Sequence, residues 1–123
     1  MPGVTVIVRD KSLMDELDSH PENIERLEQA VREKMKKMAG VSSVEFDYVV
    51  PHRSSAKAVI QLNIEYTVKE GGLMPPVTGD PEWTGNASDE MREMLEQDFF
   101  PDIVVAVWFL PQFKAGFSQT RRQ

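Results

Sequence analysis

The residue of this 123-residue chain with the most distinctive chemistry is Pro2, which follows Met1. Removal of Met1, which is usual when the second residue is small, leaves a secondary amine at the edge of a strand. An α-amino group has a pKa of about 8, and apolar neighbours lower that pKa because they disfavour the ammonium form. A neutral amine near physiological pH is a competent general base, so Pro2 is the candidate catalytic residue.

Other reactive side chains are few. The chain has no cysteine, which excludes disulfides and thiolate chemistry, and His20 and His52 stand alone without metal-ligand spacing. Glu45, Asp47 and Glu65 could offer oxygen ligands to a divalent cation. A water-exposed sheet face accounts for the same three acids, and we predict no metal site and no cofactor.

The charge and hydropathy of the chain limit the classes of partner that it can bind. The net charge is −6 and the basic residues are scattered among acids, whereas a nucleic-acid surface needs clustered Lys and Arg. No apolar run approaches the roughly 20 residues of a membrane span. The first residues lack the basic flank and apolar core of a signal peptide. We therefore expect a cytoplasmic protein that binds neither nucleic acid nor membrane.

The chain aligns with itself without a gap at an offset of sixty residues. The identical pairs include Val8 and Val68, Pro21 and Pro81, Val44 and Val104, and similar residues pair Arg9 with Lys69 and Tyr48 with Trp108. Two copies are too few for a solenoid, which needs at least three stacking units. The offset predicts a single domain over 1–123, built of two pseudo-repeats at about 1–60 and 61–120.

Each half contains the pattern strand, helix, strand. The expected strands are 4–9, 44–50, 58–68 and 103–110, and a short helical turn is expected at 13–17. The first long helix begins at Pro21 and stops at Gly40, with an apolar stripe at every third or fourth position. Residues 71–85 are rich in glycine and proline and predict a loop, so the second helix is expected after Asn86 or Ser88. Pro101 ends it.

These elements predict an α/β fold: a two-layer sandwich of two βαβ repeats, with a four-stranded mixed sheet and two helices on one face. The other face is polar, and it is either open to water or enclosed in an oligomer. Its residues are Glu45, Asp47, Gln61, Asn63, Glu65 and Thr67. Because 103–110 is apolar on both sides, it is expected to be a central strand or one covered by another subunit.

A duplicated βαβ unit that begins Met-Pro resembles the tautomerase superfamily, which includes 4-oxalocrotonate tautomerase and macrophage migration inhibitory factor. Residues 2–8 (PGVTVIV) look like the first strand of that family. Residues 40–51 (GVSSVEFDYVVP) look like its segment from helix end through second strand, and 108–117 (WFLPQFKAGF) is similar to its last strand and aromatic-glycine tail.

The resemblance implies a homotrimer whose sheets face inward. It also implies a cofactor-independent isomerase in which Pro2 moves a proton within the keto–enol pair of a small 2-oxo or 2-hydroxy-enoate acid. Such enzymes hold the substrate carboxylate with a cation close to the end of the first strand of a repeat. Arg9, Lys69 and the nearby Lys11 match that place, and Trp108 and Phe113 of the similar last segment complete the substrate-binding set. Glu45 departs from the family, because short members often present an arginine there.

A different reading of strand, helix, strand taken twice is the ferredoxin-like fold, with split βαβ units in an antiparallel sheet. RNA recognition on such a sheet needs stacking aromatics among basic residues, and the polar face here is acidic and amide-rich. The alternative function is therefore a non-enzymatic ferredoxin-like or dimeric α/β-barrel module for binding or oligomerisation, with Pro2 inert.

Overall fold

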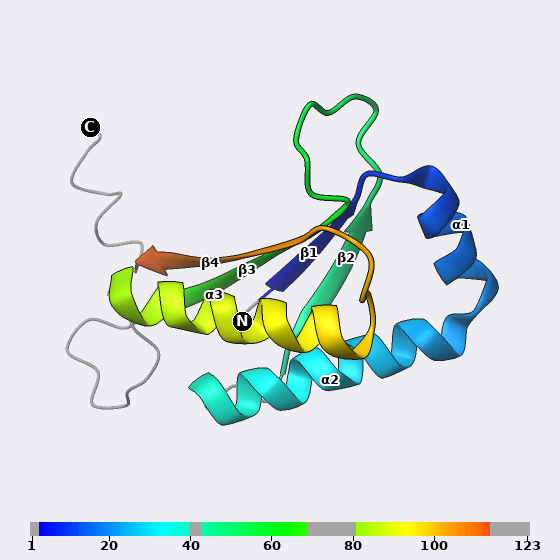
Figure 1. The fold of residues 1–123 in the computed structure, drawn as a ribbon. Coiled ribbons are helices and arrows are strands. Elements are labelled where there is room, and N and C mark those ends of the chain that lie inside the picture. The colour runs from blue at the N-terminus through cyan, green and yellow to red at the C-terminus, as the bar shows by residue number, and fades with distance from the viewer. Residues whose placement is uncertain (1–2, 40–42, 69–80, 114–123) are drawn as a thin grey trace.

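The computed structural model describes residues 3–39, 43–68 and 81–113. In chain order the elements are β1 (Gly3–Val8), α1 (Lys11–Ser19), α2 (Pro21–Ala39), β2 (Glu45–Val49), β3 (Ile60–Val68), α3 (Pro81–Asp98) and β4 (Val105–Phe113) (Figure 1). The strands form one layer and the long helices α2 and α3 lie across it. None of the described helices is both long and apolar enough to cross a membrane.

The four strands pair in the order β2-β1-β3-β4. β1 is parallel to β2, β3 is parallel to β4, and the two central strands β1 and β3 are antiparallel. The predicted α/β fold with a four-stranded mixed sheet is thus confirmed. The ferredoxin-like alternative is wrong, because in that fold the parallel strands of each βαβ unit are split by another strand, whereas here they are direct neighbours.

Three helices pack against the sheet, where two were expected. The additional helix is α1, which extends the expected short turn to nine residues. Asp10 caps it, because its Oδ1 accepts a hydrogen bond of 2.9 Å from the backbone N–H of Ser12. α2 begins at Pro21 as predicted, with Glu22 in its first turn and two lysines in its last turn, each favourable to the helix dipole.

α3 begins at Pro81, five residues before the first predicted cap, and ends at Asp98. Proline suits the first turn of a helix because its missing N–H has no partner there. Gly85 lies inside the helix, where it costs about 1 kcal/mol relative to alanine. The predicted start of this helix, which relied on the glycine and proline content of 71–85, is therefore wrong. Residues 69–80 lie outside the described part of the chain.

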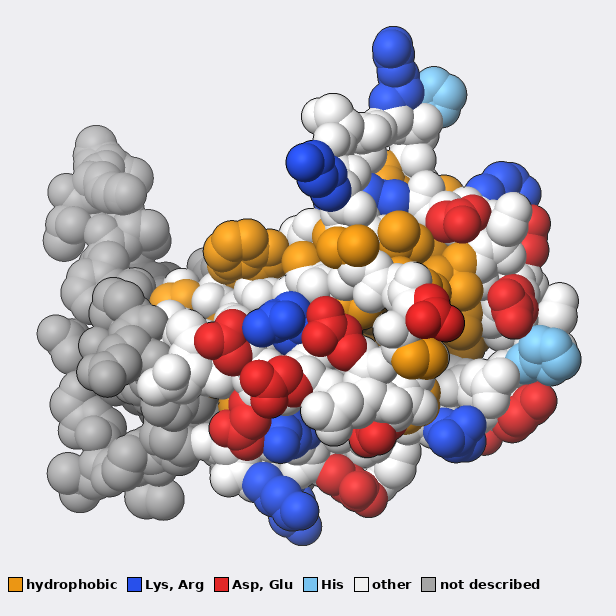
Figure 2. Space-filling view, in the orientation of Figure 1, with side chains coloured by type: hydrophobic (Ala, Val, Ile, Leu, Met, Phe, Trp, Pro, Cys, Tyr) orange, Lys and Arg blue, Asp and Glu red, His pale blue; other side chains and the backbone are white. Residues whose placement is uncertain are grey.

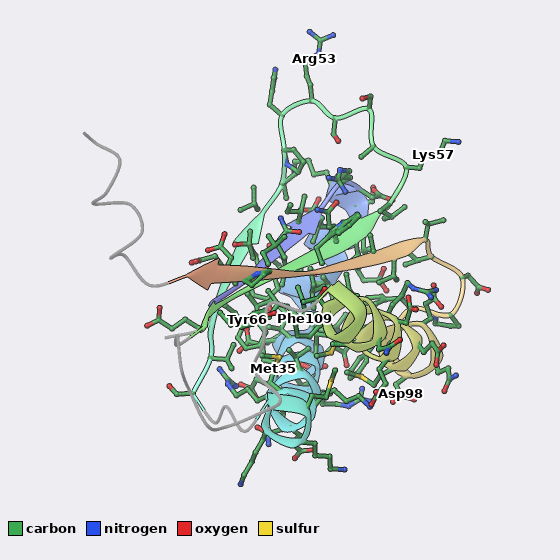
Figure 3. All side chains as sticks on the ribbon, turned by 90° about the vertical axis from the view of Figure 1, so that its left-hand side faces the viewer. Met35, Arg53, Lys57, Tyr66, Asp98 and Phe109 are labelled. Carbon is green, nitrogen blue, oxygen red and sulfur yellow. The ribbon has the colours of Figure 1, made fainter. Side chains whose placement is uncertain are left out.

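The core lies between the sheet and the helices. From Ile60 to Tyr66 of β3 every second residue is buried, and the same alternation holds for β1. Met35, Tyr66 and Phe109 mark this layer in Figure 3. Burial of each large apolar side chain contributes about 1.5–3 kcal/mol, so this layer is the main source of stability. Its members are Val4, Val6, Val8, Leu17, Leu27, Val31, Met35, Val44, Ile60, Leu62, Ile64, Tyr66, Ala87, Met91, Leu95, Phe100, Val105, Val107 and Phe109.

β4 is an edge strand, so the first of the two alternatives, a central strand, is wrong, and cover by another subunit stays a prediction. Val105, Val107 and Phe109 point into the core, whereas Val104 and Trp108 on the other face are exposed by 59% and 56%. β4 is therefore apolar on both faces, of which one packs against the core and the other is uncovered in the single chain.

Candidate functional site

The face of the sheet away from the helices, here called the open face, carries the candidate site. Strand pairing aligns its residues in rows across the sheet. One row runs Asp47, Thr5, Asn63, Trp108, and the next runs Val49, Ile7, Gln61, Ala106. The open face is therefore acidic along β2, mixed in the centre and apolar along β4.

Arg9, directly after β1, is the best-positioned cation on this face. Its guanidinium donates from Nε to Ser54 Oγ at 2.7 Å, from Nη1 to the carbonyl of Ala58 at 3.0 Å and from Nη2 to Gln61 Oε1 at 3.1 Å. Its backbone N–H also donates to the carbonyl of Val59 at 2.8 Å. These contacts hold the base of the β2–β3 loop, which projects beyond the sheet (Figure 1).

Every one of these partners of Arg9 is neutral. Among the described residues, no carboxylate lies within ion-pair distance of Arg9, so its charge is not neutralised within this part of the chain. A guanidinium has five N–H donors in a fork that matches a carboxylate, and some of them remain for a ligand. The arrangement can therefore bind an anion without first breaking an internal salt bridge.

The polar contacts continue from Arg9 toward β4. Gln61 accepts from Arg9 and donates from Nε2 to Asn63 Oδ1 at 2.8 Å. Asn63 is the strand partner of Trp108, which projects from the open face. Sequence alternation predicted the facing of Gln61 and Asn63, but not their connection to Arg9. No sequence signal indicated Ser54 and Ala58, because the loop conformation brings them to the guanidinium.

The structure describes only some of the other predicted site residues. Lys11 lies in the first turn of α1, and its ammonium pairs with Asp15 at 3.6 Å. Phe113 ends β4, and its side chain lies outside the described part. Pro2 and Lys69 lie outside the described residues.

The length of β1 separates the two parts of the predicted site. Six residue steps of about 3.3 Å each place Gly3 and Arg9 about 20 Å apart along the strand. Gly3 pairs with Glu65 of β3, so the end of β3 lies beside the start of β1. In a single chain, Arg9 therefore cannot hold a small substrate that reacts at the beginning of β1.

The strand pairing also places two carboxylates at the beginning of β1. Gly3 pairs with Glu45 on one side and with Glu65 on the other, and both side chains are exposed. No group of three or more acidic or histidine side chains among the described residues is arranged to hold a metal ion. These acids would act through their charge, by favouring a protonated amine nearby and disfavouring an anion.

Tyr48 and Tyr66 face the helices and are not part of the open face. Burial raises the pKa of Tyr66 to about 12. Burial also raises the pKa of Tyr48, and so does its hydrogen bond to Glu28, whose Oε2 accepts from the phenol at 2.8 Å. Both phenols stay protonated near neutral pH and serve packing and hydrogen bonding, so neither is a candidate catalytic acid.

Comparisons with known proteins do not assign a family. No family model matches the sequence, and no curated protein matches it significantly. The structure itself shows a small α/β fold with a four-stranded mixed sheet, and we infer the function from that topology and from the geometry of the open face.

Proposed function

We propose that this protein is a tautomerase-like isomerase that assembles as a homotrimer through the open face of its sheet. The observation that supports this proposal is the strand order β2-β1-β3-β4, in which two parallel βαβ pairs meet through antiparallel β1 and β3. The tautomerase resemblance of the sequence implies this layout.

The composition of the open face supports burial in an assembly. The four exposed large hydrophobic residues among those described are Val49, Val50, Val104 and Trp108. Val49 and Trp108 belong to the open face, and Val104 precedes β4 on the same side. Large apolar side chains that stay exposed on a sheet face are a feature of protein–protein interfaces, and Trp is enriched in them.

The proposed chemistry uses the amine of Pro2 after removal of Met1. The amine takes the hydroxyl proton of an enol and a proton is returned to the adjacent carbon, which yields the ketone. A cation holds the carboxylate of the substrate. Because Arg9 lies about 20 Å from the start of its own β1, it would serve the Pro2 of a neighbouring copy, and Lys69 is the candidate within the same chain.

One observation favours a second candidate function, a non-enzymatic oligomerisation module. Glu45 and Glu65 flank the beginning of β1, where the amine of Pro2 and an anionic substrate would have to meet. Their charges favour the ammonium form of the amine and repel a carboxylate. In this alternative the open face still assembles, but the assembly has no tautomerase activity.

The test combines intact mass, light scattering and an enol assay. Intact mass shows whether the amine belongs to Met1 or Pro2, and light scattering should give a trimer. The demethionylated protein should ketonise phenylenolpyruvate, and Pro2→Ala should lower the rate about 100-fold. Lys36→Ala is the control, because Lys36 is exposed on α2, away from the start of β1 and from the open face.

The outcomes separate the two candidates. A trimer in which wild type and Pro2→Ala have equal rates near background would leave the oligomerisation module. A monomer or dimer in dilute buffer would remove the trimer and, with it, the supply of Arg9 from a neighbour.

A further inference from the structure

The helix layer contains a pocket that the proposed function does not use. It is a hollow of about 310 Å³ between α1, the first turns of α2 and the connection from α3 to β4, and we call it the helix-layer pocket. Figure 2 shows hydrophobic side chains reaching the surface between α1 and this connection, with acidic side chains beside them. The pocket lies on the helix side of the sheet, so covering the open face would not close it.

The floor of the pocket is apolar and held by the backbone. Leu17, Leu27 and Phe100 are buried beneath it, and Leu13 and Ile103 line it while partly exposed. The connection after α3 is fixed by hydrogen bonds from the N–H groups of residues 99 and 100 to the carbonyl of residue 95, at 3.0 and 2.9 Å. An apolar floor of this size accepts one large aliphatic or aromatic group.

Arg26 lines the pocket and forms no ion pair with the acidic side chains of the described residues. The Cζ of Arg26 lies 5.5 Å from the centre of the Phe99 ring, a cation–π distance. Its Nη1 also makes a long contact of 3.4 Å to Asn23 Oδ1. Within the described residues no carboxylate is within ion-pair distance of Arg26, although the pocket rim is acidic.

The acids of the rim are likewise unpaired. Glu16, Asp98 and Asp102 line the pocket, are exposed, and form none of the ion pairs found in the described part of the chain. The pocket therefore presents separate positive and negative groups around one apolar floor. Such an arrangement is complementary to a ligand that carries both charges on an apolar body.

From this arrangement we infer that the helix-layer pocket binds a free α-amino acid with a large apolar side chain. The carboxylate pairs with the Arg26 guanidinium, the ammonium faces Glu16 and Asp102, and the side chain covers the apolar floor. A simple carboxylate is repelled by the acidic rim, and a simple amine leaves Arg26 without a partner. The zwitterion is the ligand class that satisfies both signs of charge.

The test is titration calorimetry on the full chain with four probes. L-phenylalanine carries both charges and an aromatic body, phenethylamine lacks the carboxylate, hydrocinnamate lacks the amine, and glycine lacks the body. We expect L-phenylalanine to bind with a Kd on the order of 1 mM or below, and each of the other probes at least about tenfold more weakly.

Substitutions locate the binding. Arg26→Gln should weaken L-phenylalanine about tenfold or more and leave phenethylamine unchanged, because only the carboxylate contact is lost. Glu16→Gln combined with Asp102→Asn should weaken both amines. Arg53→Gln is the matched control, since Arg53 is an exposed arginine on the β2–β3 loop, far from the pocket (Figure 3).

Three results would overturn the inference, and none of them depends on isomerase activity. The first is no heat of binding with L-phenylalanine up to about 20 mM, well above the expected Kd. The second is binding of hydrocinnamate as tight as that of L-phenylalanine. The third is an unchanged affinity in Arg26→Gln that has the circular dichroism spectrum of wild type.

Discussion

The first half of the molecule (β1, α2, β2) and the second half (β3, α3, β4) present their long helices to the core in the same way. Leu27, Val31 and Met35 of α2 are buried, and so are the residues sixty positions later in α3, which are Ala87, Met91 and Leu95. The central strands also agree, since the buried positions 4 and 6 of β1 correspond to 64 and 66 of β3.

The last strands of the two halves differ. Val44 is exposed by 6% and faces the core, whereas Val104, sixty residues later, is exposed by 59%. Tyr48 packs toward α2, whereas its counterpart Trp108 projects from the open face.

The strand register gives the reason for this difference. In the first half Gly3 pairs with Glu45, and the same offset in the second half would pair residue 63 with residue 105. Residue 63 pairs instead with Trp108, three positions further along. A shift by an odd number of residues moves every side chain of a strand to the opposite face. The shift thus places Trp108 on the open face and gives that face its apolar edge along β4.

The strongest test of the shared helix packing is truncation at one pair of positions. Met35→Ala and Leu95→Ala each remove a fully buried side chain, and each should lower the free energy of unfolding by about 2–5 kcal/mol. Urea denaturation measures the change, and Lys36→Ala on the exposed side of α2 is the control. A near-neutral result for either core variant would show that the two helices do not contribute alike.

Alkaline pH should lower the free energy of unfolding through Tyr66. This residue occupies the position in the second half that Val6 has in the first half. Burial raises the pKa of Tyr66 to about 12, from 10 when unfolded. Because the pKa is higher in the folded state, the protonated phenol of Tyr66 contributes fully to stability below pH 10. That contribution is lost as the pH rises toward 12. Relative to Tyr66→Phe, wild type should lose about 2–3 kcal/mol over this window.

Unfolding by urea at several pH values between 9 and 12 checks this prediction, with about one measurement per half unit of pH. Tyr48→Phe is the control. Because it retains Tyr66, it should still show the fall in the free energy of unfolding at alkaline pH that Tyr66 causes. Parallel curves for wild type and Tyr66→Phe would contradict the assignment of that loss to the buried phenol.

The register difference itself can be tested with one valine from each half. Val44→Ala should lower the free energy of unfolding by about 1–3 kcal/mol, because the side chain is in the core. Val104→Ala should change it by less than about 0.5 kcal/mol in the monomer, because the side chain is exposed. Equal effects in dilute protein would show that the two strands face alike.

The sequence predicted the layers of this fold because hydrophobic periodicity depends on local spacing. The stripe of α2 and the alternation of β3 determine which sides are buried, and Pro21 marks where α2 begins. The start of α3 was also available in Pro81, the counterpart of Pro21. The composition of the preceding segment outweighed that signal, since turn residues usually exclude a helix.

The register of β4 and the partners of Arg9 could not be predicted from the sequence. Val104 to Leu110 is apolar at every position, so alternation does not say which residues face the core. The partners Ser54 and Ala58 of Arg9 come from a loop about fifty residues away in the chain, and their approach depends on tertiary structure. The sequence therefore indicated the cation but not the neutral environment that surrounds it.

A modest effect is expected at Tyr48, the residue whose counterpart in the second half faces outward. Its phenol donates to Glu28, and Glu28 also contacts Arg32 at 3.5 Å, so the hydroxyl joins β2 to α2. Tyr48→Phe should lower the free energy of unfolding by about 0.5–1.5 kcal/mol at neutral pH.

Trp108→Phe should change the unfolding of the dilute monomer by less than about 0.5 kcal/mol, since most of the indole is exposed. Urea denaturation at low protein concentration compares the two variants. In wild type, the phenol of Tyr48 donates its hydrogen bond throughout the neutral pH range, because burial and Glu28 both raise the pKa of Tyr48. If Trp108→Phe were the more destabilising change even at the lowest concentration, the outward face of β4 would already be packed within a single chain.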